Sequence, residues 1–284
     1  MRRFEYISPT NIADVCKLLD EFKEEAQLLA GGTDLLIELR KPSARSLKVI
    51  IDISRVSELM GIEEMSDSVS IKPLATHTDI YQSNIIQQYA PLLRQAVATI
   101  GSPQIRNRGT VGGNIMNAAA CADTVPPLMA LDAMVTIQSV HGKRMVPLRD
   151  FFVKPYQTVA EKNEILTEII FPKLLNSTKS AFIKLGRRNA LAISRLSVAA
   201  ILRQSEQGVI QEARIVPGAA FPQWQRVTDA EKLLIGQTPS RELFTEAGKK
   251  VSEVMISFTG RRWSTEYKEP VITVLVRRAL EACQ

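Results

Sequence analysis

Apolar positions recur with a helical period in two stretches of the N-terminal half of the chain. The first stretch predicts a helix from about Ser8 to Phe22, with Ser8 as its N-cap and Pro9 in its first turn. Its apolar face consists of Ile12, Val15, Leu18, Leu19 and Phe22. The second stretch predicts an amphipathic helix over Pro91–Ile100.

Shorter apolar runs predict strands between these helices and after them. Val49–Ile51 has the continuous apolar character of a buried strand, whereas Val69–Ile71 alternates and is predicted to be a strand at an exposed edge. Two runs on either side of His141-Gly142 predict a hairpin with those two residues as its turn. A further strand is predicted over Glu164–Phe171, ending at Pro172.

The last third of the chain has a different order of elements. Two long runs, Ser194–Gln204 and Val209–Ala220, predict antiparallel strands joined by a turn that contains Gly208. Helical spacing then predicts three helices, over Ala230–Ile235, Arg241–Met255 and Tyr267–Cys283. The polar connector after Pro172 divides the chain into residues 1–173 and 178–284, and the fold class is α+β, because the C-terminal part pairs an antiparallel sheet with helices.

Composition is that of a globular protein. The chain has 284 residues, of which 45% are hydrophobic and 23% charged. The formal net charge of +6 comes partly from arginine pairs such as Arg187-Arg188, which suit either a solvated face or docking to an acidic partner subunit. No basic run interleaved with aromatic residues predicts nucleic-acid binding.

The three cysteines, Cys16, Cys121 and Cys283, are too dispersed for a metal cluster or a disulfide framework. We expect Cys16 and Cys121 to be small buried residues. Neither end resembles a targeting segment, and no apolar run approaches the ~20 residues of a membrane helix. A cytoplasmic location is therefore expected.

Candidate chemistry begins with Thr110-Val111-Gly112-Gly113-Asn114. Two glycines without Cβ atoms let a bulky ligand approach the main chain, and we expect several backbone N–H groups to be free to hold a pyrophosphate there. A tight turn between two strands explains two glycines equally well.

A second glycine turn favours the ligand site. Leu28, Leu29 and Ala30 form an apolar run before Gly31-Gly32, and an amphipathic helix is expected to follow from Leu35. A strand, a glycine turn and a helix N-terminus together form an anion site. Thr33 or Asp34 is expected to cap that helix.

The segments AGGTDLL and TIGSPQIRNRGTVGGNI, with Asp123 nine residues beyond Asn114, resemble the FAD-binding subunit of the molybdenum hydroxylases. These include xanthine, nicotinate and carbon monoxide dehydrogenases, and their FAD domain is of the p-cresol methylhydroxylase and vanillyl-alcohol oxidase type, with two lobes. GAAFPQWQRVTDAEKLLIGQ and EYKEPVITVLVRRAL resemble the C-terminal domain of the same subunit. The resemblance therefore covers essentially the whole chain.

The resemblance implies FAD contacts at positions that match the family. They are Leu28, Leu29, Ala30, Gly31, Gly32, Thr33, Asp34, Leu35, Ile100, Thr110, Val111, Gly112, Gly113, Asn114, Asp123, Leu166 and Lys184. For Ile100 and Leu166, packing in the core is an equally good local explanation. Asp123 suits a ribose or adenosine hydroxyl, or alternatively the N-cap of a helix near Thr124.

Lys184 matches a family lysine that reaches toward the flavin, although Ile183 could occupy that place instead. The two histidines are expected to lie outside the flavin motifs, with His77 as a neutral capping or surface residue and His141 at a hairpin tip. Neither has partners that imply catalysis, and no catalytic side chain is predicted.

The resemblance further implies an oxidoreductase subunit of the xanthine dehydrogenase type. FAD would receive electrons from a small subunit with two [2Fe–2S] clusters, after substrate oxidation on a large subunit with the molybdopterin cofactor, and pass them to NAD⁺. A heterotrimer or its dimer acting on a purine or another N-heterocycle is the first hypothesis. The alternatives are a carbon monoxide or aldehyde dehydrogenase subunit with another acceptor and, less well supported, a stand-alone flavin oxidase.

Overall fold

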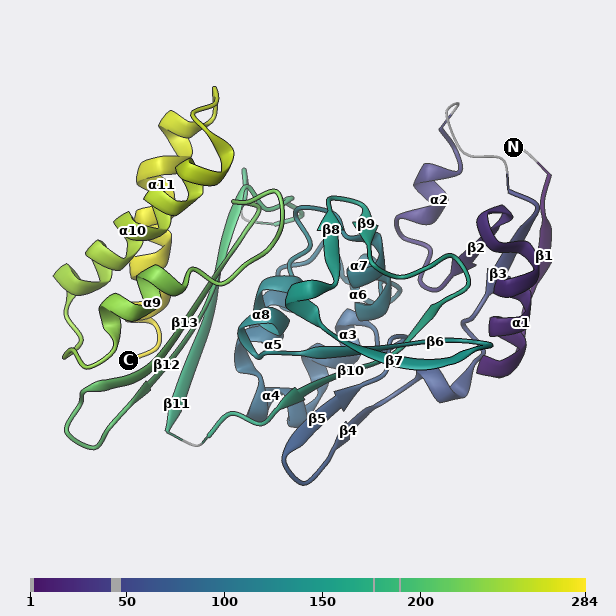
Figure 1. The fold of residues 1–284 in the computed structure, drawn as a ribbon, viewed down its shortest axis with the longest axis horizontal. Coiled ribbons are helices and arrows are strands. Elements are labelled where there is room, and N and C mark those ends of the chain that lie inside the picture. The colour runs from purple at the N-terminus through teal and green to yellow at the C-terminus, as the bar shows by residue number, and fades with distance from the viewer. Residues whose placement is uncertain (1–2, 42–46, 176, 189) are drawn as a thin grey trace.

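Figure 1 shows an N-terminal lobe, a middle lobe and a C-terminal domain side by side, each built on its own sheet. The computed structural model describes residues 3–41, 47–175, 177–188 and 190–284. Helices and strands are mixed throughout, so the α+β class predicted from the sequence is confirmed.

The N-terminal lobe is a small parallel sheet with the strand order β1-β3-β2. Its elements are β1 (Glu5–Ile7), α1 (Ile12–Phe22), β2 (Ala26–Leu29), α2 (Leu35–Glu38) and β3 (Val49–Asp52). The first helix begins at Ile12 and not at Ser8, because the Asn11 side chain accepts a hydrogen bond from the Asp14 N–H at 2.9 Å and caps it there.

The middle lobe is an antiparallel sheet with the order β4-β5-β10-β6-β7. These strands are β4 (Ile62–Glu64), β5 (Ser68–Ile71), β6 (Met134–Ser139), β7 (Gly142–Pro147) and β10 (Ile165–Pro172), and a small hairpin pairs β8 (Phe152–Lys154) with β9 (Gln157–Thr158). Its helices are α3 (His77–Gln82), α4 (Asn84–Tyr89), α5 (Pro91–Ala98), α6 (Pro103–Arg106), α7 (Val111–Asn117) and α8 (Val125–Ala130).

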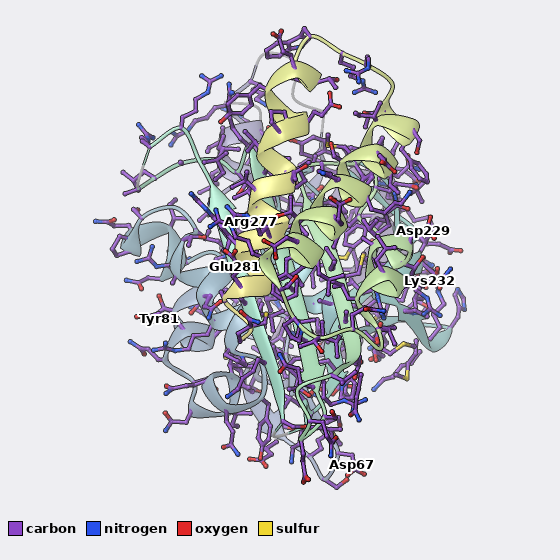
Figure 2. All side chains as sticks on the ribbon, turned by 90° about the vertical axis from the view of Figure 1, so that its left-hand side faces the viewer. Asp67, Tyr81, Asp229, Lys232, Arg277 and Glu281 are labelled. Atoms are coloured by element: carbon purple, nitrogen blue, oxygen red, sulfur yellow. The ribbon has the colours of Figure 1, made fainter. Side chains whose placement is uncertain are left out.

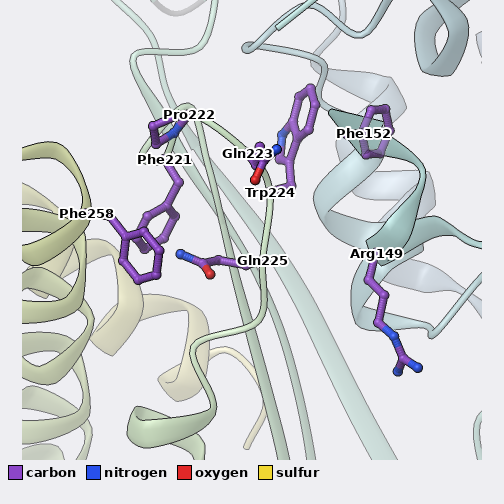
Figure 3. Close-up of a pocket in the computed structure, with 8 residues that line it drawn as sticks. All are labelled: Arg149, Phe152, Phe221, Pro222, Gln223, Trp224, Gln225 and Phe258. Carbon is purple, nitrogen blue, oxygen red and sulfur yellow. The ribbon is translucent and has the colours of Figure 1, made fainter. Parts of the chain in front are cut away.

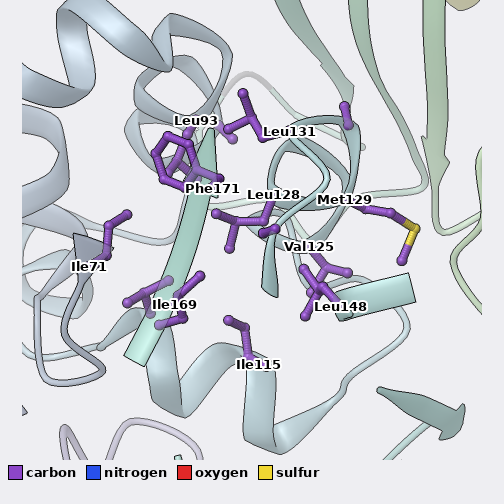
Figure 4. Packing of buried hydrophobic residues seen from close by; sticks show 14 of the residues in the cluster. Ile71, Leu93, Ile115, Val125, Leu128, Met129, Leu131, Leu148, Ile169 and Phe171 are labelled. Carbon is purple, nitrogen blue, oxygen red and sulfur yellow. The ribbon is translucent and has the colours of Figure 1, made fainter. Parts of the chain in front are cut away.

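The core of the middle lobe lies between this sheet and its helices. Figure 4 shows Ile169 and Phe171 of β10 among side chains from α5, α7 and α8, including Leu93, Ile115 and Leu128. All five of these side chains are buried. Burial of this apolar surface fixes the helices that carry the second glycine segment.

Two predictions for this lobe were wrong in detail. Val69–Ile71 is not an exposed edge, because β5 lies between β4 and β10 and its central residues are fully buried. Its polar residue is satisfied internally, since the Ser70 hydroxyl donates to Glu168 at 2.6 Å. The hairpin turn is Val140-His141 rather than His141-Gly142, because Gly142 already pairs with Ser139.

The C-terminal domain places three helices on one face of an antiparallel sheet, as Figures 1 and 2 show. The strands are β11 (Thr178–Leu185), β12 (Leu196–Gln204) and β13 (Ile210–Gly218), and the helices are α9 (Thr228–Leu234), α10 (Arg241–Thr259) and α11 (Thr265–Glu281). The strands and helices predicted here are confirmed. The labelled pairs Asp229–Lys232 and Arg277–Glu281 form ion pairs along these helices.

The opposite face of this sheet is also buried, against the middle lobe. Phe182, Ile201 and Val216 belong to the same hydrophobic cluster as the helices of that lobe, whereas Val198 and Ile215 belong to the cluster beneath α10 and α11. Alternate residues of one strand therefore serve two cores.

Candidate functional site

The first glycine turn leaves a row of backbone donors unused. Strand β2 ends at Leu29, helix α2 begins at Leu35, and Gly32 between them has a positive φ of 74°. Within the described ranges, the N–H groups of residues 31–35 donate to no protein acceptor. Asp34 occupies the N-cap position but its side chain makes no capping bond, so the predicted cap is wrong and these N–H groups remain available to an anion.

The second glycine segment behaves differently from the prediction. Thr110 caps α7, and the four N–H groups of residues 111–114 all donate within the protein, to Ala75, Pro73 and Thr110. The expectation that Gly112-Gly113 offers several free N–H groups is therefore wrong. These residues begin a helix whose first turn docks on the backbone near Pro73.

The two glycines of this segment have different surroundings. A Cβ atom on Gly112 would lie 2.4 Å from the Pro73 Cβ, so this buried glycine is required for packing. Gly113 is exposed, and only the Thr110 hydroxyl oxygen, at 2.9 Å, lies near its Cβ position. A ligand can therefore approach the main chain at Gly113.

The two segments, about 80 residues apart in sequence, touch each other at Gly31. A Cβ atom there would lie 1.9 Å from the carbonyl oxygen of Arg108 and 3.1 Å from the Cα of Gly109. Only glycine allows this approach. The first turn, with its free N–H groups, therefore adjoins the backbone that leads into α7 and Gly113. We call the two segments together the cofactor cradle (residues 30–35 and 109–114).

His77 is buried against the cofactor cradle and not exposed on the surface. The residue is 3% exposed, and its backbone N–H donates to the Gly109 carbonyl at 3.0 Å. A Cβ atom on Gly109 would lie 3.1 Å from the Cδ2 of the His77 ring. Burial, helped by the nearby charge of Arg106, lowers the pKa of His77 to about 4. The prediction of a neutral histidine is confirmed, and the predictions that it lies on the surface and away from the flavin motifs are wrong.

Asp123 is the centre of a buried polar cluster. The Lys184 ammonium donates to Asp123 Oδ2 at 2.7 Å and to the Thr99 carbonyl at 3.1 Å, and the Ser194 hydroxyl donates to Asp123 Oδ1. The two ionised side chains are 7% and 8% exposed. Burial raises the pKa of Asp123, while Lys184 and Ser194 act in the opposite direction. The alternative capping role is wrong, because Thr124 occupies the N-cap position of α8.

Strand alternation decides between Ile183 and Lys184. Ile183 packs on the cluster beneath α10 and α11, whereas Phe182 and Lys184 are directed to the middle lobe. Lys184 therefore lies on the cofactor side. Its charge, however, is already paired with Asp123, so a free cation near the flavin is not what the geometry provides.

The remaining predicted residues lie around the same region. Leu166 is buried in the core at a bulge of β10, and Ile100 is half-buried after α5. The side-chain amide oxygen Oδ1 of Asn114 accepts a hydrogen bond from the Thr124 hydroxyl at 2.6 Å. Sequence reasoning missed Arg106, which donates to the Ile100 carbonyl at 3.0 Å, although it lies within the quoted motif.

The residues present fit FAD. A row of free N–H groups suits the pyrophosphate, and the open main chain at Gly113 admits a bulky group. Asp123 lies in the turn between α7 and α8. Its two oxygens already accept hydrogen bonds from Lys184 and Ser194, and each retains a lone pair that a hydroxyl group can use.

A separate cavity of about 210 Å³ lies at the junction of the middle lobe and the C-terminal domain (Figure 3). Its lining is mostly aromatic and amide side chains: Arg149, Phe152, Phe221, Pro222, Gln223, Trp224, Gln225 and Phe258. No residue of the cofactor cradle contributes to it.

The cysteines carry no metal site. Within the described ranges, no group of three or more His, Cys, Asp or Glu side chains is arranged to hold a metal ion. Cys16 is buried, as predicted, whereas Cys121 is only half-buried, so the prediction of a buried residue there is wrong. Cys283 is also buried, and burial raises its pKa to about 12. None of the helices in the described residues has the length and apolar character needed to span a bilayer.

Comparison with known proteins agrees with this geometry. Residues 2–174 match the family model of the FAD binding domain in molybdopterin dehydrogenase, and residues 180–283 match the CO dehydrogenase flavoprotein C-terminal domain. The nicotine 6-hydroxylase medium subunit of Paenarthrobacter nicotinovorans is 35% identical, over 97% of this chain and 95% of the relative. The xanthine dehydrogenase FAD-binding subunit of Escherichia coli O157:H7 is 32% identical, over 97% of this chain and 94% of the relative.

A solved structure is similar over the whole chain. Carbon monoxide dehydrogenase from Hydrogenophaga pseudoflava superposes with a TM-score of 0.92 at 31% identity, covering 99% of this chain and 97% of that chain. The likeness extends through both domains.

Proposed function

The chain belongs to the family of FAD-binding subunits of molybdopterin dehydrogenases, and from this premise we propose that it passes electrons from a [2Fe–2S] partner subunit to NAD⁺. The observation that carries the proposal is the cofactor cradle, where a row of unpaired N–H groups meets an exposed glycine backbone. FAD, when bound, accepts electrons singly and releases two together as a hydride, which is the chemistry such a relay requires.

The side chains of this subunit position the cofactor and do not transfer protons to a substrate. The free donors of residues 31–35 bind the anionic pyrophosphate. Asp123 presents a carboxylate whose orientation is fixed by Lys184 and Ser194 of the C-terminal domain. Ile100, which is half-buried, supplies apolar surface for the flavin ring, and the buried Leu166 supports the core behind it.

We further propose that the complex oxidises a purine or another N-heterocycle. The nicotine 6-hydroxylase and xanthine dehydrogenase relatives support this substrate class. The similarity to carbon monoxide dehydrogenase supports an alternative, in which the complex oxidises carbon monoxide or an aldehyde and uses another acceptor. The substrate binds on a different polypeptide, so the residues of this chain do not choose between them.

The first experiment is to purify the protein from its native host and to record its visible spectrum and its copurifying polypeptides. Flavin absorption overlaid by iron–sulfur absorption, with two further subunits and molybdenum, is expected. A lone yellow protein that oxidises a phenol or an alcohol directly would favour a flavin oxidase and contradict the proposal.

The acceptor and substrate are then tested on the intact complex. Reduction of NAD⁺ with an N-heterocycle such as xanthine or nicotinate is expected. Absence of NAD⁺ reduction with every N-heterocycle, together with reduction of a quinone by carbon monoxide or an aldehyde, would replace this proposal by the alternative.

A further inference from the structure

Several cations at one end of the C-terminal domain form no ion pair with a carboxylate in the described residues. The loop between β11 and β12 and the turn between α10 and α11 lie at the upper end of this domain in Figure 1. One of the cations there, Arg261, pairs with Glu269 of α11 at 3.0 Å. Within the described ranges, no carboxylate lies within ion-pair distance of the other five cations. Together with one exposed aromatic residue they form what we call the basic end: Arg187, Arg188, Arg195, Arg262, Trp263 and Lys268.

Most cations in the rest of the domain form ion pairs. Eight of them form ion pairs with carboxylates: Lys184, Arg203, Arg214, Arg226, Lys232, Lys249, Lys250 and Arg277. Lys179, Arg241 and Arg278 form no ion pair in the described residues either, but they lie at the beginning of β11, at the beginning of α10 and near the end of α11. Cations without an ion pair are therefore concentrated at the basic end, where they outnumber the two carboxylates of Glu266 and Glu269.

The cations of the basic end are close enough to act on one another. The Arg195 guanidinium lies over the Tyr267 ring at 5.4 Å, next to Lys268, whose ammonium donates to the Ala219 carbonyl at 2.9 Å. Burial lowers the pKa of Lys268, and the charges of Arg195 and Arg262 lower it further. Like charges held together destabilise the isolated subunit and would be relieved by an opposing negative surface.

Exposed apolar side chains accompany this charge. Trp263 is 90% exposed, Ile193 76% and Phe258 61%. Aromatic residues and arginine are enriched at the centres of protein interfaces, and an exposed Trp is typical of an anchor that a partner covers. A tryptophan that stands almost free of its own surface suits a macromolecular partner and not a small ligand in a cavity.

The basic end adjoins the cofactor site. The loop from Gly186 to Ser194 begins two residues after Lys184, and both Lys184 and Ser194 bind Asp123. We propose that the basic end docks an acidic surface of the electron-donating iron–sulfur subunit. This inference rests on the proposed function, because that function requires an electron donor to approach the flavin.

The charge is tested with a double reversal, Arg187→Glu with Arg262→Glu, in the FAD-loaded subunit. The matched control reverses two unpaired arginines elsewhere in the domain, Arg241→Glu with Arg278→Glu, and so changes the net charge equally. The measurement is the Kd for the purified iron–sulfur subunit at about 0.05 M and about 0.5 M salt, since salt screens exposed charges. The test pair should raise Kd by about tenfold or more at low salt, chiefly through a slower association rate, and less at high salt.

The apolar anchor is tested with Trp263→Ala. Kd should rise by about tenfold at both salt concentrations, because the lost contact is not electrostatic. Retained FAD absorption shows that each variant is folded. An unchanged Kd for both the charge reversal and Trp263→Ala would overturn the inference, as would equal weakening by the control pair.

Two other results would also overturn it. If Trp263→Ala changes only the self-association of the subunit, measured by sedimentation, the basic end binds a second copy. If the wild-type protein copurifies with no iron–sulfur subunit, the proposed function itself fails. That result differs from the one in which the complex forms and its Kd is unchanged by these variants, which overturns only the docking inference.

Discussion

At the scale of single residues, adjacent glycines in the two motifs have unrelated tasks. Gly31 allows two distant backbone segments to touch, Gly112 fits against Pro73, and Gly113 leaves the main chain open to solvent. The letters GG alone do not distinguish these tasks, because each depends on what lies opposite the missing Cβ atom.

Gly31→Ala should weaken FAD binding. The added Cβ atom would lie 1.9 Å from the Arg108 carbonyl oxygen, so the two halves of the cofactor cradle must separate. Overpacking of this kind costs about 1–3 kcal/mol, or roughly 10- to 100-fold in Kd. Fluorescence titration of the apoprotein with FAD measures it. Gly61→Ala is the control for a general loss of stability: its φ of 114° makes this substitution strained too, but nothing lies within 4 Å of its Cβ position and it lies outside the cofactor cradle. Equal Kd values for the two variants would contradict the assignment.

His77 should make the protein less stable in mild acid. Its pKa is about 4 in the folded protein and about 6.5 in the unfolded chain, so between these values the unfolded state binds more protons. Stability therefore falls as pH decreases through this window, by about 2 kcal/mol between pH 7 and pH 5. Urea unfolding at the two pH values measures the change. A smaller pH dependence is expected for His77→Gln, and an unchanged dependence would mean that other groups cause it.

At the scale of elements, strand β11 connects the two domains by alternation. Ala181, Ile183 and Leu185 pack beneath the C-terminal helices, while Phe182 and Lys184 are directed to the middle lobe. The strand register thus places the ammonium of Lys184 beside the carboxylate of Asp123 on another element. A shift of one residue would exchange an apolar side chain for the charge.

Lys184→Met should destabilise the fold by about 3–5 kcal/mol, because it leaves the buried Asp123 carboxylate unpaired. Loss of the ammonium should raise the pKa of Asp123 further. The loss of folding stability in this variant should therefore become smaller as pH falls and the carboxylate takes up a proton. Denaturant unfolding of Lys184→Met, Asp123→Asn and the double variant measures the coupling. Strictly additive single effects would show that the two groups do not stabilise each other.

At the scale of the whole molecule, the C-terminal sheet is shared by two cores. Ile201 and Trp224 lie in the cluster of the middle lobe, whereas Leu280 lies beneath the same sheet on the helix side. The Asp123 cluster lies at this junction, so the relative position of the domains is set by apolar burial and by that cluster.

The middle lobe and the C-terminal domain should unfold together. Ile201→Ala and Leu280→Ala, in opposite cores, should each lower a single transition by about 2–5 kcal/mol. A Trp263→Phe background leaves Trp224 as the one tryptophan, so its fluorescence reports the junction. Its midpoint should coincide with that from far-UV circular dichroism. Separate midpoints would mean that the domains are independent.

The sequence alone determined the class of fold, most of the elements and the two glycine motifs, because periodicity and glycine patterns are local properties of the chain. It identified Asp123 and Lys184 but could not pair them, since their contact joins residues 61 positions apart. The sequence also did not predict that β5 and His77 are buried, or that the N–H groups of residues 111–114 donate within the protein.

What only the tertiary structure decided is which groups remain free. The N–H groups of residues 31–35 are available because the turn packs on Arg108 without being capped, and those of the second segment are consumed by Pro73 and Ala75. Both segments contain the residues Gly-Gly, so the sequence alone does not show which backbone N–H groups are free. Whether a donor meets a protein acceptor or a ligand depends on long-range packing, and for that reason the binding surface emerges only when the chain is folded.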